Sequence, residues 1–283
     1  MSETTPLHSN PEHPSPSPVG PTPDAWLMAQ WKEFVAALKF LTTLPVPGAT
    51  QLFTTGTADA TLFVGSAYFP LVGLLLALIL WLVVLIFGAQ VSSLVLAALL
   101  VVALVILTGG LHLDGLMDCC DGLFGGTSRE RKLEIMRDSR VGSFGVLGGV
   151  CLLFLKFALL ASLDRYHLPF ALLAILPISR WNMVLAMYAF PGARPSGLGE
   201  AYRRTVTRKR LICAAVLSLL IALLSGPILV GLLLWICGTL VAWITGEWIT
   251  HVLGGLTGDV YGALAEFSEV VLLLLFTLLH VWL

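Results

Sequence analysis

The sequence predicts an all-α protein that crosses a membrane several times as a bundle of helices. Apolar residues make up 57% of the 283 residues and charged residues only 12%, whereas charged residues form roughly 25% of an ordinary soluble domain. The apolar residues are also gathered into runs near the ~20 residues that one helix needs to cross a bilayer. A soluble protein of this composition would expose a large apolar surface to water, so we exclude that class.

The N-terminal region differs from the rest of the chain. Residues 1–24 contain seven prolines and no apolar run, which predicts a disordered tail because such a segment buries little surface. Residues 25–283 are expected to form a single transmembrane catalytic domain. Its first segment, Trp26–Leu44, mixes aromatic and aliphatic residues with lysine and glutamate. This mixture predicts an amphipathic helix lying in the membrane interface.

About seven apolar segments are predicted to cross the bilayer, five of them clear and two shorter. The clear segments are Leu62–Phe87, Val91–Thr108, Val141–Leu163, Leu168–Phe190 and Pro227–Thr245, and the shorter ones are Leu211–Ser225 and Ser268–Leu283. Lysine and arginine are concentrated in the loops 109–140 and 191–210. Because cytoplasmic loops carry the excess of positive charge, both loops are predicted to be cytoplasmic.

The densest chemical signal directly follows a predicted span, in the glycine-rich segment 109–122. Asp114, Asp118 and Asp121 are spaced so that a helix would project all three carboxylates from one face. Like charges stacked in this way repel one another, so we expect a cation to compensate them. Carboxylate oxygens suit Mg²⁺, Mn²⁺ or Ca²⁺. The pattern predicts a catalytic metal site at these three residues, with a solvated acidic face as the alternative.

The same loop continues into a segment rich in paired charges. If it is helical, Glu134 and Asp138 lie one turn apart, and Arg137 and Arg140 share a face. Guanidinium groups match the geometry of phosphate oxygens, so Arg137, Ser139 and Arg140 are predicted to bind substrate and Asp138 to act in catalysis. The alternative is a surface helix whose arginines only set the membrane topology.

Two ionisable residues lie within predicted spans. Lys156 sits in the middle of one span, and Arg180 lies in a polar, proline-interrupted patch of the next. Because charges at such depth are costly, they are functional candidates by default. We predict that both bind substrate; the alternatives are that they snorkel toward the membrane surface or form a structural ion pair.

A second glycine-rich segment near the C-terminus repeats part of the first. The string Gly254-Gly-Leu with Asp259 matches Gly109-Gly-Leu with Asp114 in spacing, and Glu266 follows seven residues after Asp259. A chance match explains so short a string, but two equivalent sites at the membrane edge would explain it too. We predict that Asp259 is catalytic and faces the same cavity as the three aspartates, and that Glu266 contacts substrate.

Charge and cysteine content exclude other kinds of partner. The net charge of −1 gives no basis for binding nucleic acid. The five cysteines show no C-x-x-C spacing, so neither a disulfide framework nor a zinc site is supported. The sequence leaves the oligomeric state open, a homo-oligomer included.

The motifs resemble those of adenosylcobinamide-GDP ribazoletransferases, a family also called cobalamin synthases. The strings that carry the resemblance are Phe40–Pro47, Gly109–Gly122, Leu133–Gly145 and Leu253–Glu269. The resemblance implies an Mg²⁺-dependent enzyme of the bacterial cytoplasmic (inner) membrane. Such an enzyme joins α-ribazole, or its 5′-phosphate, to adenosylcobinamide-GDP and releases GMP.

Two other functions share some of these features. CDP-alcohol phosphotransferases of lipid synthesis also direct a hydroxyl at a nucleotide diphosphate, but the spacing of Asp114, Asp118 and Asp121 differs from theirs. A transporter of divalent cations, or one coupled to protons, also uses membrane carboxylates. Its acids are expected near the middle of broken spans, whereas here they cluster at a glycine-rich edge.

Overall fold

The computed structural model describes residues 23–46 and 65–280, which are helical along most of their length. In chain order the elements are α1 (Pro23–Leu41), η2 (Ser66–Tyr68), α2 (Phe69–Phe87), α3 (Ser93–Thr108), α4 (Leu111–Gly125), α5 (Arg129–Ile135), α6 (Ser143–Ser162), α7 (His167–Ala189), α8 (Leu198–Thr205), α9 (Arg208–Leu224), α10 (Ile228–Leu253) and α11 (Gly258–His280). The predicted disordered tail lies outside the described residues, except that Pro23 and Asp24 already belong to α1.

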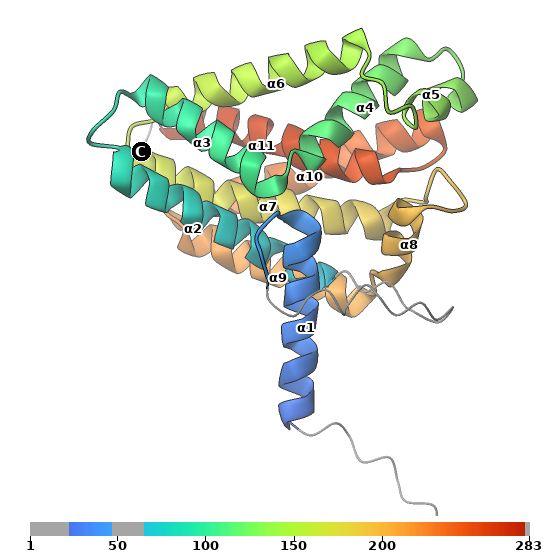
Figure 1. Cartoon of the computed structure of the whole chain (residues 1–283). Helices are drawn as coiled ribbons and strands as arrows, with labels where there is room; N and C mark the ends of the chain where they lie inside the picture. The colour runs from blue at the N-terminus through green and yellow to red at the C-terminus, as the bar shows by residue number, and fades with distance from the viewer. Residues whose placement is uncertain (1–22, 47–64, 281–283) are drawn as a thin grey trace, which may run out of the picture.

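The long helices form one bundle, which confirms the predicted fold class of a multi-pass membrane protein (Figure 1). Within the described residues, five helices are long and apolar enough to cross a membrane, and α3 with α4 would form a sixth, bent span. The 17-residue α9 is apolar but shorter than these spans. The prediction of about seven spans is therefore approximate, although every apolar segment it named is helical where described.

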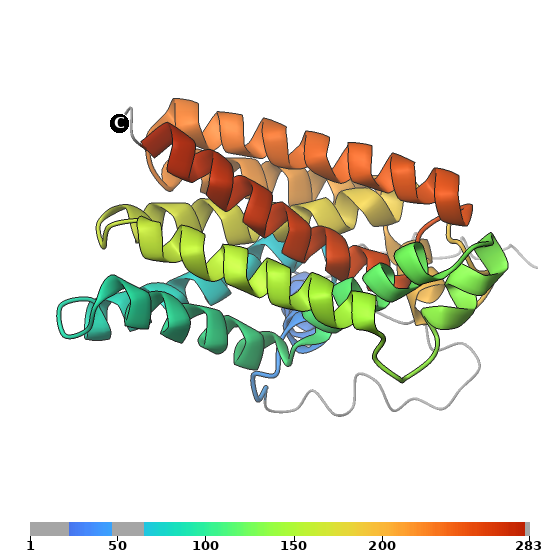
Figure 2. The same cartoon turned by 90° about the horizontal axis from the view of Figure 1, so that it is seen from above.

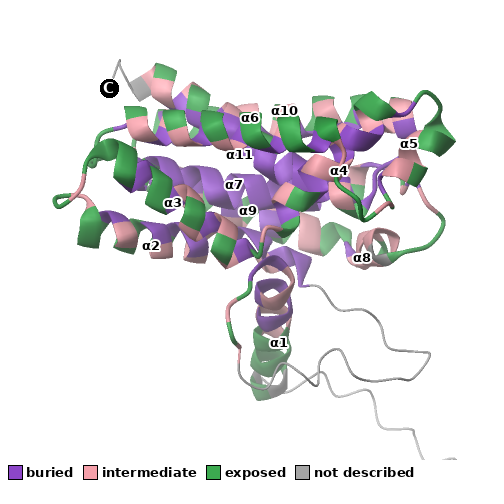
Figure 3. Cartoon of the chain, turned by 45° about the horizontal axis from the view of Figure 1, so that its top comes forward, coloured by how far each residue is buried: buried purple, intermediate pink, exposed green. Residues whose placement is uncertain are grey.

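Helix α7 forms the centre of the bundle. It is buried along most of its length, whereas α6 and α10 each expose an apolar face (Figure 3). Seen from above, α6, α11 and α10 lie side by side, with α2 and α3 along one edge (Figure 2). An exposed apolar face on a spanning helix is suited to lipid, so this arrangement places the outer helices against the bilayer.

One end of the bundle carries the short helices and the positively charged loops. Helices α4, α5 and α8 lie there, opposite the end with the α2–α3 turn (Figure 1). The two loops that the positive-inside rule groups together are in contact, because Arg194 Nη2 donates a hydrogen bond of 3.0 Å to the Leu133 carbonyl. Both loops therefore lie on one side of the membrane, as the charge bias predicts.

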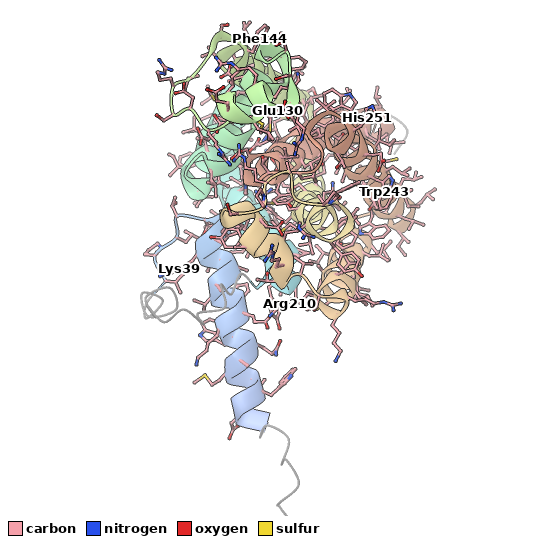
Figure 4. The ribbon with its side chains drawn as sticks, turned by 90° about the vertical axis from the view of Figure 1, so that its right-hand side faces the viewer. Lys39, Glu130, Phe144, Arg210, Trp243 and His251 are labelled. Carbon is pink, nitrogen blue, oxygen red and sulfur yellow. The ribbon has the colours of Figure 1, made fainter. Side chains whose placement is uncertain are left out.

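Helix α1 runs crosswise to the bundle, as expected of an interfacial helix. Viewed from the end of the bundle that carries α5 and α8, α1 points away from the bundle, with Lys39 near its inner end (Figure 4). Its outer residues Trp26 and Trp31 are exposed, whereas the middle of the helix is fixed by a 2.9 Å ion pair between Glu33 and Arg210. Tryptophan side chains suit the polar–apolar boundary of a bilayer, so this geometry favours a position along the membrane surface.

The final span begins ten residues earlier than predicted. Helix α11 starts at Gly258 rather than Ser268, so that Glu266 and Glu269 lie inside it. The predicted segment already contained Glu269, and the helix extends it by the flanking residues 258–267, which include Glu266. Both are buried and paired with Lys156, and pairing makes their burial compatible with a membrane helix.

Candidate active site

A pair of glycines precedes each of the two helices that carry the aspartates of the site. Gly109 ends α3 and Gly254 ends α10, and both have the left-handed backbone conformation, with φ of 63° and 72°. This conformation is readily adopted by glycine and stops a helix sharply. In each case the chain enters a new helix whose first turn contains an aspartate, Asp114 in α4 and Asp259 in α11. The short sequence repeat therefore has a structural counterpart.

The first turns of α4 and α11 pack backbone against backbone. A Cβ atom added to Gly115 would lie 2.6 Å from the Asp259 carbonyl oxygen, and one added to Gly262 would lie 3.0 Å from the His112 Cα. Only glycine allows this approach. As a result Asp114 and Asp259, 145 positions apart in the sequence, line one cavity of about 330 Å³.

Asp118 lies one helical turn beyond Asp114 and completes a concentration of negative charge. Its carboxylate is under the electrostatic influence of Asp114, Asp259 and Asp121. Within the described ranges, no three His, Cys, Asp or Glu side chains form a preassembled metal site. The donor atoms nevertheless fit magnesium, which usually takes one or two carboxylates together with substrate phosphates.

Asp121 is held differently from the other aspartates. The backbone N–H groups of Gly142 and Gly145 donate hydrogen bonds of 2.8 and 2.7 Å to its two carboxylate oxygens. A Cβ on either glycine would come within 2.3 Å of this carboxylate. Asp121 therefore caps the first turn of α6 and fastens it to α4, and it lines a second cavity of about 460 Å³.

Arg194 joins the acidic group from the loop between α7 and α8. Two backbone hydrogen bonds attach this loop to the turn before α11, from Ala193 N to Leu256 O (2.9 Å) and from Leu256 N to Pro191 O (2.8 Å). Gly255 is needed there, because a Cβ would lie 2.6 Å from Ala193 N. Burial lowers the pKa of Arg194, while the neighbouring Asp259 and Asp118 carboxylates raise it.

The predicted pairing of Arg137 with Arg140 on one helix face is wrong. Helix α5 ends at Ile135, so neither residue is helical. Arg137 lines a third cavity, of about 350 Å³, together with Arg129 and Arg194. Arg140 instead lines the second cavity with Asp121 and Asp138.

The two charged side chains of segment 138–140 form an ion pair with each other. Arg140 Nη2 donates to Asp138 Oδ2 over 2.6 Å, and these hydrogen bonds from Arg140 lower the pKa of Asp138 to about 2. Ser139 lies between the two in the chain. Asp138 and Arg140 therefore line the second cavity with Asp121, and none of the three predicted site residues lines the cavity that Asp114 and Asp259 share.

Lys156, Arg180 and Glu266 lie deeper, in a buried network of ion pairs. Lys156 Nζ lies 2.6 Å from Glu266 Oε2 and 2.7 Å from Glu269 Oε2. Glu269 also accepts from Arg180 Nη1 over 2.6 Å. This is the ion-pair alternative stated for Lys156 and Arg180, and it ties α6, α7 and α11 together beneath the site.

Sequence reasoning missed Arg194 as a site residue and missed Glu269 in the network. Arg194 was used in the sequence analysis only as part of the positive charge of its loop. Its position between Ala193 and Pro195, just after a span, is a local feature that could have marked it as a site residue. The backbone pairing with Leu256 that brings it to Asp259 has no signal in the sequence.

The capping geometry makes a prediction about Asp121. Asp121→Ala should lower the free energy of unfolding by about 1–3 kcal/mol, because the cap is lost and two backbone donors lose their acceptor. Unfolding by SDS in mixed micelles, followed by circular dichroism, measures this change. Asp118→Ala is the matched control and should not be destabilised, since it relieves charge repulsion. Equal destabilisation of the two variants would contradict the capping role.

Comparison with known proteins agrees with the motifs. The family model described as cobalamin-5-phosphate synthase matches residues 33–277. An adenosylcobinamide-GDP ribazoletransferase of Desulfitobacterium hafniense (strain Y51) is 40% identical over 254 residues, covering 87% of this chain and 97% of the relative. The protein of the same name from Roseiflexus sp. (strain RS-1) is 42% identical over 245 residues, covering 86% of this chain and 88% of the relative.

A third relative extends the same result to the enterobacteria. The adenosylcobinamide-GDP ribazoletransferase of Escherichia coli O45:K1 (strain S88 / ExPEC) is 37% identical over 245 residues, covering 86% of this chain and 98% of the relative. No solved structure matches the chain. The matched region contains all the site residues described above, from Asp114 in α4 to Glu269 in α11. The chain belongs to the cobalamin-5-phosphate synthase family.

Proposed function

We propose that this protein transfers the cobinamide-phosphate group of adenosylcobinamide-GDP to a ribose hydroxyl of α-ribazole, or of its 5′-phosphate, and releases GMP. The observation that carries the proposal is the meeting of Asp114 and Asp259 on one cavity, with Asp118 and Arg194 beside them. Carboxylates that hold a metal, next to a guanidinium, are the groups that phosphoryl transfer needs. The family's relatives bear the name of this reaction.

The proposed step breaks a phosphoanhydride bond and forms a phosphate ester in its place. The ribose oxygen forms a bond to the phosphorus that carries cobinamide, and the bond from this phosphorus to the bridging oxygen breaks. The bridging oxygen leaves with GMP. The hydroxyl proton passes to a carboxylate, for which we propose Asp259, because it lines the cavity and its position is fixed by a 3.1 Å hydrogen bond from Thr257.

We further propose that Asp114 and Asp118 hold Mg²⁺. When bound, magnesium neutralises charge on the pyrophosphate and on the departing phosphate. Asp121 remains a predicted ligand only through the lone pairs that its two capping hydrogen bonds leave. Arg194 and Arg137, which line one cavity beside the aspartates, are proposed to bind the phosphate oxygens of the nucleotide.

The site is proposed to face the cytoplasm, from the cytoplasmic membrane of a bacterium. Support comes from the arginine-rich loops, which lie at the same end of the bundle as α4, α5 and α8 (Figure 1). Positively charged loops are retained on the cytoplasmic side. Membrane lipid would then surround α6 and α10, and α1 would rest on the inner surface.

A product assay with purified protein tests the proposed function. Wild-type protein in lipid nanodiscs, supplied with Mg²⁺, adenosylcobinamide-GDP and α-ribazole, should release one GMP for each corrinoid joined. Replacing the corrinoid substrate with CDP-diacylglycerol and an alcohol should give no product. Product from the lipid substrates alone, or vectorial Mg²⁺ or proton movement without GMP release, would contradict the proposal.

The carboxylates should differ from other aspartates in their effect on turnover. Asp114→Asn, Asp118→Asn and Asp259→Asn keep the side-chain shape but remove the charge, so each should lower kcat by more than about 10²-fold. GMP release by folded, purified variants measures this. Asp164→Asn, in the turn between α6 and α7 at the opposite end, is the control and should leave kcat unchanged. Near-normal kcat in two of the three site variants would overturn the assignment.

Arg194 should matter for its geometry as well as for its charge. Arg194→Lys keeps the charge but loses the fork that binds two phosphate oxygens, so kcat/KM for adenosylcobinamide-GDP should fall about 10-fold or more. Arg208→Lys, at an exposed position at the start of α9, should change nothing. Arg140→Lys tests, by the same measurement of kcat/KM, whether the second cavity binds substrate. A wild-type rate for Arg194→Lys would show that this residue only fixes topology or packing.

A further inference from the structure

The cavity shared by Asp114 and Asp259 has walls quite unlike those of the neighbouring basic cavity. Away from the two carboxylates it is lined by apolar and aromatic side chains, chiefly Phe40, Leu111, Met183, Met187, Tyr202 and Tyr261. The adjacent cavity of about 350 Å³ is lined instead by five charged side chains, those of Arg129, Arg137, Arg194, Glu130 and Glu134, beside a few apolar residues. A volume of about 330 Å³ falls in the range of small-molecule sites, which are mostly apolar with a few well-placed polar groups.

The aromatic wall is built from two segments far apart in the chain. Phe40 at the end of α1 meets Tyr202 of α8 edge to face, with ring centroids 4.6 Å apart, and stacks on Phe69 at 5.7 Å. Helix α8 is held against the start of α11, because a Cβ on Gly199 would lie 2.6 Å from Gly258 N. The wall is therefore fixed in position beside Asp259.

Two buried polar atoms on the residues that line this cavity lack a partner. The Tyr261 hydroxyl and the His112 Nε2 make no hydrogen bond within the described part of the chain, although both side chains are at least 98% buried, with relative exposures of 2% and 1%. An unsatisfied buried group costs about 1–3 kcal/mol. Each such group calls for an explanation, and at these two residues a ligand in the cavity would supply the missing partner.

We infer that this cavity binds the benzimidazole base of the ribazole substrate, while the arginine-lined cavity takes the nucleotide end of the other substrate. This inference rests on the proposed function. A methylated benzimidazole is planar and apolar and carries one ring nitrogen able to accept a hydrogen bond. Its faces suit the Phe40 and Tyr202 rings and the thioethers of Met183 and Met187. The Tyr261 hydroxyl can donate to the ring nitrogen.

This placement also explains how the acceptor hydroxyl is aimed. A base seated against the aromatic wall leaves its ribose toward the carboxylate side of the same cavity, where Asp114 and Asp259 lie. The hydroxyl is then held near its proton acceptor and next to the arginines that bind the phosphate. The two substrates thus approach the carboxylates from cavities of opposite character.

Separate KM values for the two substrates test the assignment. Tyr202→Leu and Phe40→Leu should each raise the KM for α-ribazole about 10-fold, while the KM for adenosylcobinamide-GDP changes by less than about twofold. Phe154→Leu, which changes an exposed aromatic residue of α6, is the matched control and should leave both KM values unchanged. A rise confined to the KM for adenosylcobinamide-GDP would overturn the inference.

A milder variant separates ligand contact from folding. Tyr261→Phe keeps the ring and removes only the hydroxyl, so it should raise the KM for α-ribazole several-fold but leave the KM for an indole riboside unchanged, because indole lacks the accepting nitrogen. Equal effects on both nucleosides would exclude the proposed hydrogen bond.

Equilibrium dialysis of α-ribazole alone against wild type and Tyr202→Leu measures binding independently of turnover. Binding by wild type without GMP release would keep the cavity assignment and reject the proposed function, whereas equal binding by both proteins would reject the cavity assignment.

Discussion

The close approach of α4 and α11 at Gly115 is the constraint on which the site depends. With no side chain at this position, the Asp259 carbonyl comes within 2.6 Å of where a Cβ would stand. The first turns of two helices can then share one cavity. Gly109 and Gly254 make this possible, because they end α3 and α10 sharply before α4 and α11 begin. The loop with Arg194 joins it through the backbone pairing of Ala193 with Leu256.

The buried ion pairs beneath the site also hold α11 in place. Glu269 bridges Lys156 of α6 and Arg180 of α7, so that three helices are fixed to one another in the buried interior. Removing one member of such a network would leave an uncompensated buried charge, which is strongly unfavourable. The network therefore restrains α11 along its length, and Asp259 lies at the restrained end.

Sequence patterns predicted the class of the protein, its apolar segments and most of its carboxylates, because these follow from composition and helical periodicity. The repeat of Gly-Gly-Leu with a following aspartate left chance as an alternative, yet Asp114 and Asp259 do line one cavity, whereas Asp121 lines another. The capping of α6 by Asp121, the end of α5 at Ile135 and the place of Arg194 could not be predicted. The cap and the place of Arg194 depend on contacts between segments that only the packed bundle brings together.

Replacing Gly115 tests the central claim most directly. Gly115→Ala should lower the rate of GMP release about 10²-fold, since small displacements of reacting groups have effects of this size, while the protein still purifies as a folded monodisperse species. Gly231→Ala is the control. Its Cβ would lie 2.2 Å from the Ala222 carbonyl, at a contact between α9 and α10, so it should reduce thermal stability without a specific loss of kcat. A near-normal rate for Gly115→Ala, or equal losses of kcat in both variants, would contradict the account.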